Sequence, residues 1–300
     1  MKRIIAALGL MLTVAIGSPV AAQITTATVA GGKLMGVEHD GIVSFKGIPF
    51  AAPPVGALRW KAPQPLKAWS GTKTADTFAP ACIQDPALAA FMQMPSNFSE
   101  DCLYLNVWTP AKATGEKRAV MVWIYGGGFA GGATSAGVYD GTKFAKKGAV
   151  LVSVAYRLGA FGFLAQPELS KESGKGSGNY GLEDMIAGLR WVKDNIAQFG
   201  GDPANVTILG ESAGGIAVSM LAASPAAKGL FAKAVSESGG ALQPPLTSNE
   251  GGQNTPTLML AEKRGVAFFA KISAANLTTT HAVSAETIQK TTNTTLDNGF

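Results

Sequence analysis

The chain has few charged residues and almost no imbalance between the two signs. Asp, Glu, Lys and Arg make up 15% of the 300 residues, whereas hydrophobic residues make up 47%. This composition excludes an intrinsically disordered chain, because enough apolar surface is available to offset the entropy lost on folding. The formal net charge of +5 falls to +3 if Lys2 and Arg3 are removed with a leader segment. So small a surplus does not indicate nucleic-acid binding.

Cysteine and histidine are also scarce. The chain contains Cys82, Cys102, His39 and His281, and no other residue of either type. These four residues have none of the spacings that are typical of a metal site. We therefore expect no bound metal ion.

The only long apolar run lies at the N-terminus. Lys2 and Arg3 precede the apolar residues 4–17, and the small residues Val20 and Ala22 follow. Because the run is shorter than the ~20 residues that span a bilayer, the pattern favours a signal peptide over residues 1–22 rather than an uncleaved anchor. We expect cleavage before Gln23, export to the periplasm or the medium, and no stable membrane insertion.

Export changes the interpretation of the two cysteines. Cys82 and Cys102 enclose nineteen residues, and an oxidising compartment favours a disulfide between them. Closing a loop of that size stabilises the folded state by roughly 3 kcal/mol in the chain-entropy model.

Strand and helix patterns alternate along most of the chain. The N-terminal part is rich in strand patterns, with a hairpin turn at His39, Asp40 and Gly41. Several later strands are continuous apolar runs, which indicates burial on both faces. Strands are expected at residues 25–29, 34–38, 41–45, 103–109, 119–125, 150–156, 206–209 and 233–236, and helices at 180–199, 213–223 and 258–271. This order predicts an α/β fold with helices on both faces of a central sheet that is mostly parallel after its first strands.

The sequence Gly-Glu-Ser-Ala-Gly at 210–214 matches the nucleophile-elbow pattern Gly-x-Ser-x-Gly. The strand pattern of residues 206–209 leads into it, and a helical pattern leads out of it. The glycines permit a sharp turn, so the hydroxyl of Ser212 is expected at the end of a central strand. The amides that begin the following helix then face any negative charge that develops. We interpret Ser212 as a candidate nucleophile, with a serine that merely caps the helix as the alternative.

A second glycine cluster, Gly126 to Gly128, follows the strand pattern of residues 119–125. Glycines let backbone amides approach a ligand without hindrance from a side chain. Together with the amide of Ala213, these amides are suited to bind the oxyanion of a tetrahedral acyl intermediate. Removing one such donor raises the activation barrier by ~3 kcal/mol.

The same stretch also fits the dinucleotide-binding pattern Gly-x-Gly-x-x-Gly, at Gly126, Gly128 and Gly131. No helical pattern begins at Gly131, however, and no acidic residue lies between Asp140 and Glu168, where one is needed near a ribose. We therefore expect no bound dinucleotide.

These motifs and several others resemble the type-B carboxylesterase/cholinesterase family of α/β-hydrolases. They occur in the family's order over residues 24–240, and together they are highly specific. The matching strings are FKGIPFA (45–51), PPVG (53–56), SEDCLYLNVW (99–108), YGGGF (125–129), YRLGAFGFL (156–164), GNYGLED (178–184), FGGDP (199–203) and the elbow.

The resemblance implies an α/β-hydrolase fold and a serine carboxylesterase that acts on small-molecule esters without a cofactor. It implies Ser212 as the nucleophile and three oxyanion-hole amides, those of Gly127, Gly128 and Ala213. Glu211 and Ser238 are then expected to support the nucleophile from nearby.

The resemblance also implies a structural framework around the site. Its parts are a Cys82–Cys102 disulfide and two ion pairs. Arg59 is expected to pair with Glu100, and Arg157 with Asp184, in structural rather than catalytic roles.

The partners of the nucleophile are the main departure from the family pattern. An acid and then a histidine follow the serine in such enzymes, and in this family both lie farther downstream than the 88 residues present after Ser212. His281 has the right chain order but lies in a Thr-rich stretch, and His39 precedes every motif, so neither is interpreted as the base. We expect a domain over residues 23–300 that is incomplete on its C-terminal side, and a 300-residue chain that is inactive by itself.

The aromatic residues of the first disulfide loop, which bear on substrate specificity, are a second departure from the family pattern. Cholinesterases carry a tryptophan inside the first disulfide loop, where it faces a quaternary ammonium group. Between Cys82 and Cys102 the aromatic residues are Phe91 and Phe98. The difference favours an ester of an uncharged alcohol.

Two alternatives to an esterase stay open: a non-catalytic binding or adhesion module on an esterase-like scaffold, and an inactive gene fragment. The intact elbow around Ser212 weakens the first. The sequence gives no indication of the oligomeric state.

Overall fold

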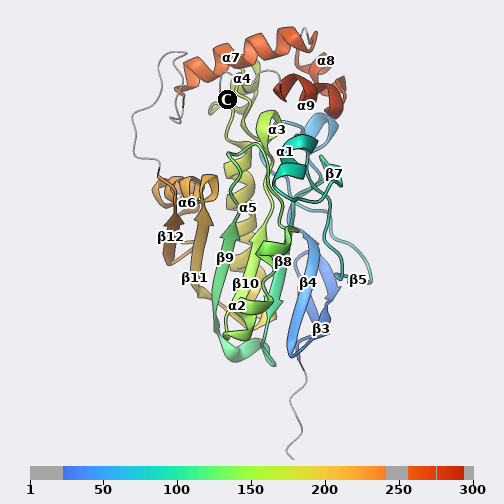
Figure 1. Cartoon of the computed structure of the whole chain (residues 1–300), viewed down its shortest axis with the longest axis vertical. Helices are drawn as coiled ribbons and strands as arrows, with labels where there is room; N and C mark the ends of the chain where they lie inside the picture. The colour runs from blue at the N-terminus through green and yellow to red at the C-terminus, as the bar shows by residue number, and fades with distance from the viewer. Residues whose placement is uncertain (1–22, 241–255, 275, 294–300) are drawn as a thin grey trace, which may run out of the picture.

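The computed structural model of the chain describes residues 23–240, 256–274 and 276–293. The predicted signal peptide, residues 1–22, lies outside these residues. The described strands form a seven-stranded main sheet, a three-stranded sheet and a two-stranded ladder (Figure 1). None of the helices in these described ranges combines the length and the hydrophobicity that a membrane span requires.

The main sheet has the strand order β12-β11-β9-β10-β8-β4-β3. Its strands are β3 (Val37–His39), β4 (Ile42–Pro49), β8 (Tyr104–Thr109), β9 (Arg118–Ile124), β10 (Val150–Val154), β11 (Gly201–Glu211) and β12 (Lys233–Glu237). β12, β11, β9 and β10 are parallel, whereas the pairs β10-β8, β8-β4 and β4-β3 are antiparallel. The sheet is therefore mixed: its earlier strands β3, β4 and β8 are antiparallel, and it is parallel from β9 onward in the sequence, as predicted.

The connections explain part of this difference. β3 and β4 are joined by a tight turn at Asp40 and Gly41, both with positive φ, and such a turn can only join antiparallel strands. The parallel strands are instead linked by longer crossovers that contain helices. The predicted hairpin is present, but the predicted strand 34–38 is divided at Gly36, where a methyl group would lie 2.7 Å from the carbonyl oxygen of Ser44.

Helices cover both faces of the main sheet, as predicted. Along β10, Val150, Val152 and Val154 contribute to the largest apolar core, whereas Leu151 belongs to a smaller cluster on the opposite face. The large core contains residues of α5 (Tyr180–Asn195) and α6 (Ala213–Ala223), and the small cluster contains Ala145 of α2 (Thr142–Lys146). Figure 1 shows α5 behind the sheet and α2 in front of it.

The predicted helix 180–199 consists of α5 and the 3₁₀ turn η4 (Ile196–Phe199). Its buried residues recur at three- and four-residue steps, which places them on the face toward the sheet. Gly200 follows with φ 76° and ends the helix in the left-handed conformation that glycine adopts readily.

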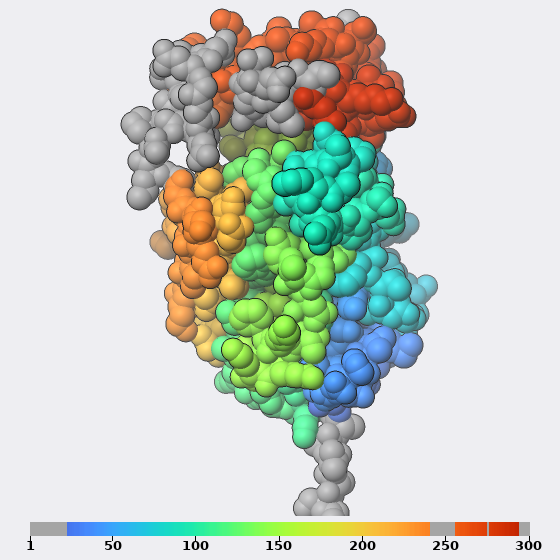
Figure 2. Space-filling view, viewed as in Figure 1, coloured from blue at the N-terminus to red at the C-terminus, as the bar shows by residue number. Residues whose placement is uncertain are grey.

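A layer of helices covers one end of the sheet, at the top of Figures 1 and 2. Phe268, Phe269 and Ile288 from this layer form a second apolar core with Trp60 and Phe161. The layer includes α3 (Gly159–Phe163), α4 (Pro167–Ser173), α7 (Leu258–Lys271), α8 (Leu277–Ala282) and α9 (Ala285–Asn293). We call α7, α8 and α9 the C-terminal helical layer.

The remaining elements are short. They are β1 (Thr26–Val29), β2 (Gly32–Met35), β5 (Thr72–Thr74), β6 (Ala81–Cys82), β7 (Phe98–Ser99), α1 (Pro86–Phe91), η1 (Gly56–Leu58), η2 (Thr114–Glu116), η3 (Gly137–Tyr139) and η5 (Pro225–Ala227).

Candidate active site

β11 leads directly into Ser212, and α6 begins at the next residue. Ser212 has φ 54° and ψ −122°, a backbone conformation that residues other than glycine rarely adopt. Such strain costs of the order of 1–3 kcal/mol and persists only where the surroundings enforce it. Here the Ser212 amide donates a hydrogen bond to the carbonyl of Glu237 (2.9 Å), and the Ser212 carbonyl accepts one from the amide of Ile216 (2.9 Å).

The elbow glycines are required by contacts with the end of β9. A methyl group at Gly214 would overlap the carbonyl oxygen of Ile124, the last residue of β9. A methyl group at Gly210 would lie 2.5 Å from the carbonyl oxygen of Gly214. The motif thus has a steric cause, because only glycine lets α6 begin so close to the neighbouring strand.

The segment 126–132, which we call the glycine loop, packs against the elbow. A methyl group at Gly126 would lie 2.6 Å from the Glu211 carbonyl oxygen and 3.1 Å from the Cβ atom of Ser212. Gly127 and Gly128 follow with φ values of 111° and 63°. Segments more than 80 residues apart in the sequence therefore meet through main-chain contacts.

Three predicted oxyanion-hole amides lie in these two segments. Within the part of the chain that the structure describes, no hydrogen bond engages the amides of Gly127, Gly128 or Ala213. Ala213 is the first residue of α6, where amide groups have no partner within the helix. Ala213 directly follows Ser212, and Gly127 and Gly128 follow the glycine that contacts the elbow, so main-chain donors without a partner among the described residues lie in both segments.

The disulfide loop, residues 82–102, lies against the other side of the glycine loop. Cys82 and Cys102 form the predicted disulfide. A methyl group at Gly131 would lie 2.9 Å from a Cδ atom of Leu88, and one at Gly127 would lie 3.2 Å from the terminal methyl of Met92. Sequence reasoning missed both apolar side chains, because neither belongs to a motif and α1 is too short to show a period.

Two buried tyrosines hold the strand ends that lead into the site. The rings of Tyr125 and Tyr156 are stacked, with their centroids 4.5 Å apart. Each hydroxyl donates to the other residue's carbonyl oxygen, at 2.8 Å from Tyr156 and 3.2 Å from Tyr125. Burial raises the pKa of both hydroxyls, so both remain protonated donors at neutral pH.

Glu211 and Ser238 lie near the elbow. A methyl group at Gly126 would lie 3.0 Å from a carboxylate oxygen of Glu211. Burial, and then the negative charge of Glu211, raises the pKa of Tyr139. Ser238 is exposed, has φ 48°, and follows β12 directly.

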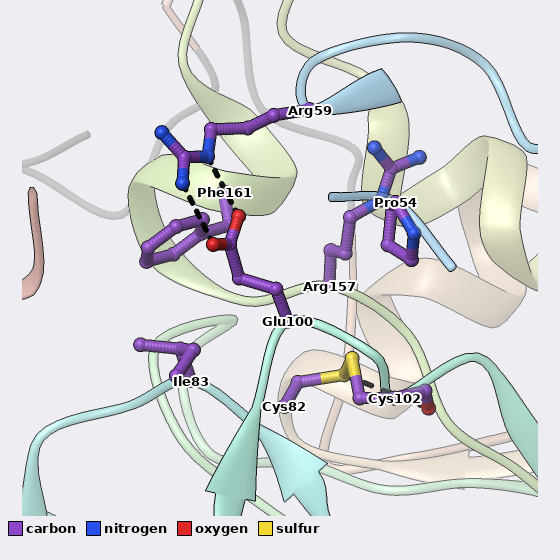
Figure 3. Close-up of a pocket in the computed structure, with 8 residues that line it drawn as sticks. All are labelled: Pro54, Arg59, Cys82, Ile83, Glu100, Cys102, Arg157 and Phe161. Atoms are coloured by element: carbon purple, nitrogen blue, oxygen red, sulfur yellow. Dashed lines mark hydrogen bonds and ion pairs between the residues drawn. A yellow bond between two sulfur atoms is a disulfide. The ribbon is translucent and has the colours of Figure 1, made fainter. Parts of the chain in front are cut away.

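Two ion pairs hold the surrounding framework. Arg157 and Asp184 are buried and bonded through two nitrogen–oxygen contacts of 2.8 and 2.7 Å. Arg59 donates to both oxygens of Glu100 at 2.6 and 2.7 Å. Figure 3 shows this second pair above the disulfide, on a cavity of about 10 Å³ that is too small for a substrate.

The two histidines lie in other parts of the fold. His39 is an exposed residue at the end of β3, whereas the His281 ring in α8 lies 5.9 Å from that of Trp60. No contact described in the structure joins either ring to Ser212. Among residues 23–240, 256–274 and 276–293, no cluster of His, Cys, Asp and Glu could hold a metal ion.

A larger cavity, of about 290 Å³, lies away from the elbow. Its walls come from the segment after η1, from α4 and from the start of α5, and they include Trp60, Leu169 and Tyr180. None of the predicted nucleophile or oxyanion-hole residues lines it.

Known proteins resemble the chain in sequence. Residues 19–299 match the sequence model of the carboxylesterase family. A fumonisin B1 esterase of Sphingopyxis macrogoltabida is 48% identical over 241 residues, which are 79% of this chain and 44% of that protein. A para-nitrobenzyl esterase of Bacillus subtilis is 47% identical over 215 residues, which are 71% of this chain and 43% of that protein.

Solved structures resemble it in fold. A thermophilic PNB esterase superposes with a TM-score of 0.80 at 39% identity, covering 91% of this chain and 54% of that one. The mixed sheet with helices on both faces is the α/β-hydrolase fold. The chain spans about half the length of the relatives that it matches. On the family match and these identities, it belongs to the carboxylesterase family.

Proposed function

We propose that the chain carries the nucleophile and the oxyanion hole of a serine carboxylic-ester hydrolase. The Ser212 hydroxyl oxygen attacks the ester carbonyl carbon while its proton passes to a general base. The carbonyl oxygen becomes negative and accepts hydrogen bonds from the amides of Gly127, Gly128 and Ala213. The alkoxide then leaves as the alcohol by taking up that proton, and an acyl-enzyme remains on Ser212.

Water completes the proposed cycle. The base removes a proton from a water molecule, whose oxygen attacks the acyl carbon. The second tetrahedral intermediate collapses, the Ser212 oxygen takes back a proton, and the carboxylic acid departs. The cycle uses no metal ion and no cofactor.

One observation carries the proposal more than any other: Ser212 occupies a strained turn beside main-chain amides that make no hydrogen bond within the described residues. A serine that merely capped α6 would need no such strain, and its side chain makes no capping hydrogen bond here. Strain of this kind is typical of functional sites.

The proposal places the general base and its acid partner outside the described residues. Neither histidine has a described contact with Ser212, and without a base the hydroxyl stays a weak nucleophile. We therefore expect the 300-residue chain by itself to be inactive.

The proposed substrate is an ester of an uncharged alcohol. Leu88 and Met92 flank the glycine loop, and neither offers the π face that attracts a quaternary ammonium group. Hydrolysis of p-nitrophenyl butyrate is therefore expected to exceed that of butyrylthiocholine in kcat/KM.

The decisive experiment uses the complete gene product, with the 300-residue chain assayed in parallel. Ser212→Ala should lower kcat for p-nitrophenyl butyrate on the order of a million-fold, as in a serine protease that loses its nucleophile. Ser219→Ala is the matched control, since Ser219 lies on α6 and its hydroxyl donates to the Gly215 carbonyl. A fluorophosphonate probe should modify Ser212 alone, as read by peptide mass spectrometry. A complete product that is neither labelled nor active would instead favour an esterase-like binding module.

We also propose that the mature protein is exported after cleavage before Gln23. The support is the leader pattern in residues 1–22 together with the disulfide. Intact-mass measurement of the exported product should give a chain that begins at Gln23, and a retained Met1 would contradict the proposal.

A further inference from the structure

The side chain of Gln84 connects the disulfide loop to the glycine loop. Its amide nitrogen donates to the carbonyl oxygen of Gly132 (2.9 Å), and its amide oxygen accepts from the Gly132 amide (2.9 Å). The same nitrogen also donates to the Cys82 carbonyl oxygen (3.1 Å). Only 1% of Gln84 is exposed, so these bonds form without competition from bulk water.

Gly132 is the residue through which the glycine loop closes. It has φ 131°, and a methyl group there would overlap the Tyr125 ring and would lie 2.8 Å from the Gly126 carbonyl oxygen. The end of the loop therefore packs on its beginning. Within the loop, the Gly127 carbonyl oxygen accepts from the amides of Ala130 and Gly131, both at 3.0 Å.

These contacts fix the peptide planes of Gly127 and Gly128. Both residues are glycines with positive φ, so they have no side chain that could restrict their rotation. Their amide directions depend on contacts made within the loop, including the bond from the Gly159 amide to the Phe129 carbonyl oxygen (2.8 Å), and on contacts made at its two ends. One end is packed against Glu211 and Ser212, and the other is bound by Gln84.

A primary amide is the side-chain group that suits this task. Gly132 presents one donor and one acceptor, and a glutamine amide offers the complementary acceptor and donor in one plane. An ionised carboxylate can only accept, and it would face the Gly132 carbonyl oxygen without a proton between them. A thioether of similar length would leave both Gly132 groups without a partner in a buried site.

We propose that Gln84 is a positioning residue for the oxyanion hole: by binding both polar groups of Gly132, it holds the glycine loop in the orientation that presents the Gly127 and Gly128 amides to the substrate. The inference rests on the proposed function. It also gives the disulfide loop a role, because Gln84 lies in this loop and binds the glycine loop from there.

The test measures ester hydrolysis by the complete gene product and by two variants of similar side-chain length. Gln84→Met should lower kcat by about 10- to 100-fold, because a displacement of about 1 Å in a reacting group costs rates of that size. KM should stay within about twofold, since the oxyanion hole acts on the transition state rather than on the bound ester.

Gln84→Glu adds a readout that a purely structural role would not give. When protonated, the new carboxyl can donate to the Gly132 carbonyl and accept from its amide, as glutamine does; when ionised it cannot. Burial raises the pKa of such a carboxyl. The ratio of kcat for Gln84→Glu to kcat for the unmodified protein should therefore rise as pH falls from 8 to 5.5, whereas the ratio for Gln84→Met stays constant. Because each ratio compares two proteins at the same pH, the effect of the general base's titration on kcat cancels.

Gln166→Met is the matched control. Gln166 is also buried, and its side chain accepts from two backbone amides at the start of α4. Its loss should lower the melting temperature about as much as Gln84→Met, but leave kcat within twofold.

The outcomes separate the two proposals. If Ser212→Ala is as active as the unmodified protein, the esterase proposal fails and the role of Gln84 fails with it. If the esterase is confirmed, the role of Gln84 is overturned by a folded Gln84→Met variant whose kcat matches that of Gln166→Met. It is also overturned by a ratio for Gln84→Glu that does not change with pH.

Discussion

The elbow region and the C-terminal helical layer are built by different means. Around Ser212, glycines let one backbone touch another, and even a methyl group at Gly210 or Gly214 would collide with main-chain atoms. In the layer, large side chains such as Phe268, Phe269 and Ile288 pack against Trp60. The elbow region has no room for an added atom, whereas the C-terminal helical layer is stabilised by the volume of its buried apolar side chains. We therefore expect substitutions in the elbow to affect chemistry first and substitutions in the layer to affect stability first.

Of three substitutions that test this comparison, Gly214→Ala should have the largest effect on the chemistry. The new methyl group would overlap the Ile124 carbonyl oxygen, so α6 has to move away from β9 and the Ser212 hydroxyl moves with it. Labelling of Ser212 by a fluorophosphonate in the complete gene product should slow by at least about 100-fold. Gly137→Ala is the control, because no atom lies within 4 Å of a methyl group there. Equal labelling of the two variants would contradict the steric account.

Phe269→Ala should have the opposite profile. Phe269 is buried and its ring centroid lies 5.8 Å from that of Trp60, so truncation should cost about 3–5 kcal/mol of unfolding free energy. The rate of Ser212 labelling below the melting transition should be unchanged. Phe91→Ala is the control, since Phe91 is 85% exposed and should cost almost nothing. Urea unfolding and Ser212 labelling should be measured on the same samples. A Phe269→Ala variant that lost both unfolding free energy and labelling rate would contradict the comparison.

His281→Gln should have the smallest effect, and one confined to acid pH. Burial, followed by smaller effects of nearby charges, lowers the pKa of His281 below 6.5; Arg59 and Lys61 add to the shift, and Glu172 opposes it. A lowered pKa in the folded state means that this histidine's contribution to stability is complete above pH 6.5 and is lost as pH falls through the folded-state value. Replacing it should therefore make the melting temperature fall less between pH 7 and pH 5, by no more than a few degrees. His39→Gln, at an exposed position, should leave the slope unchanged, and identical slopes for all three proteins would contradict the effect.

The long elements of the fold could be predicted from the sequence. Residues 213–223 and 258–271 are helices with the predicted bounds, because each is long enough to show its pattern and has a clear boundary. β11 begins at Gly201, earlier than predicted, because an irregularity between Gly201 and Val206 interrupts the apolar pattern. Helices of five to seven residues such as α1 and α4 were not predicted, since so few residues cannot display a helical period.

The candidate site was predictable where it consists of adjacent residues. The pattern around Ser212 and the three glycines at 126–128 are local, and the chemistry that they suit follows from residue type. Gln84 and Met92 were not predicted, because their relation to the glycine loop exists only after the chain has folded back. Tyr125 and Tyr156 were part of the matched strings, but nothing in the strings indicates that each hydroxyl bonds the other residue's carbonyl.

The amides of Gly127, Gly128 and Ala213 make no hydrogen bond within the described residues, and this affects how the site can be studied. Every residue except proline supplies the same N–H group, so exchanging side chains changes the position of these donors but never deletes one. Alanine scanning would therefore overlook the groups that we propose to stabilise the intermediate. Semisynthesis that replaces a single peptide N–H by an ester oxygen, at Gly127, Gly128 or Ala213, would remove one donor at a time and measure its share directly.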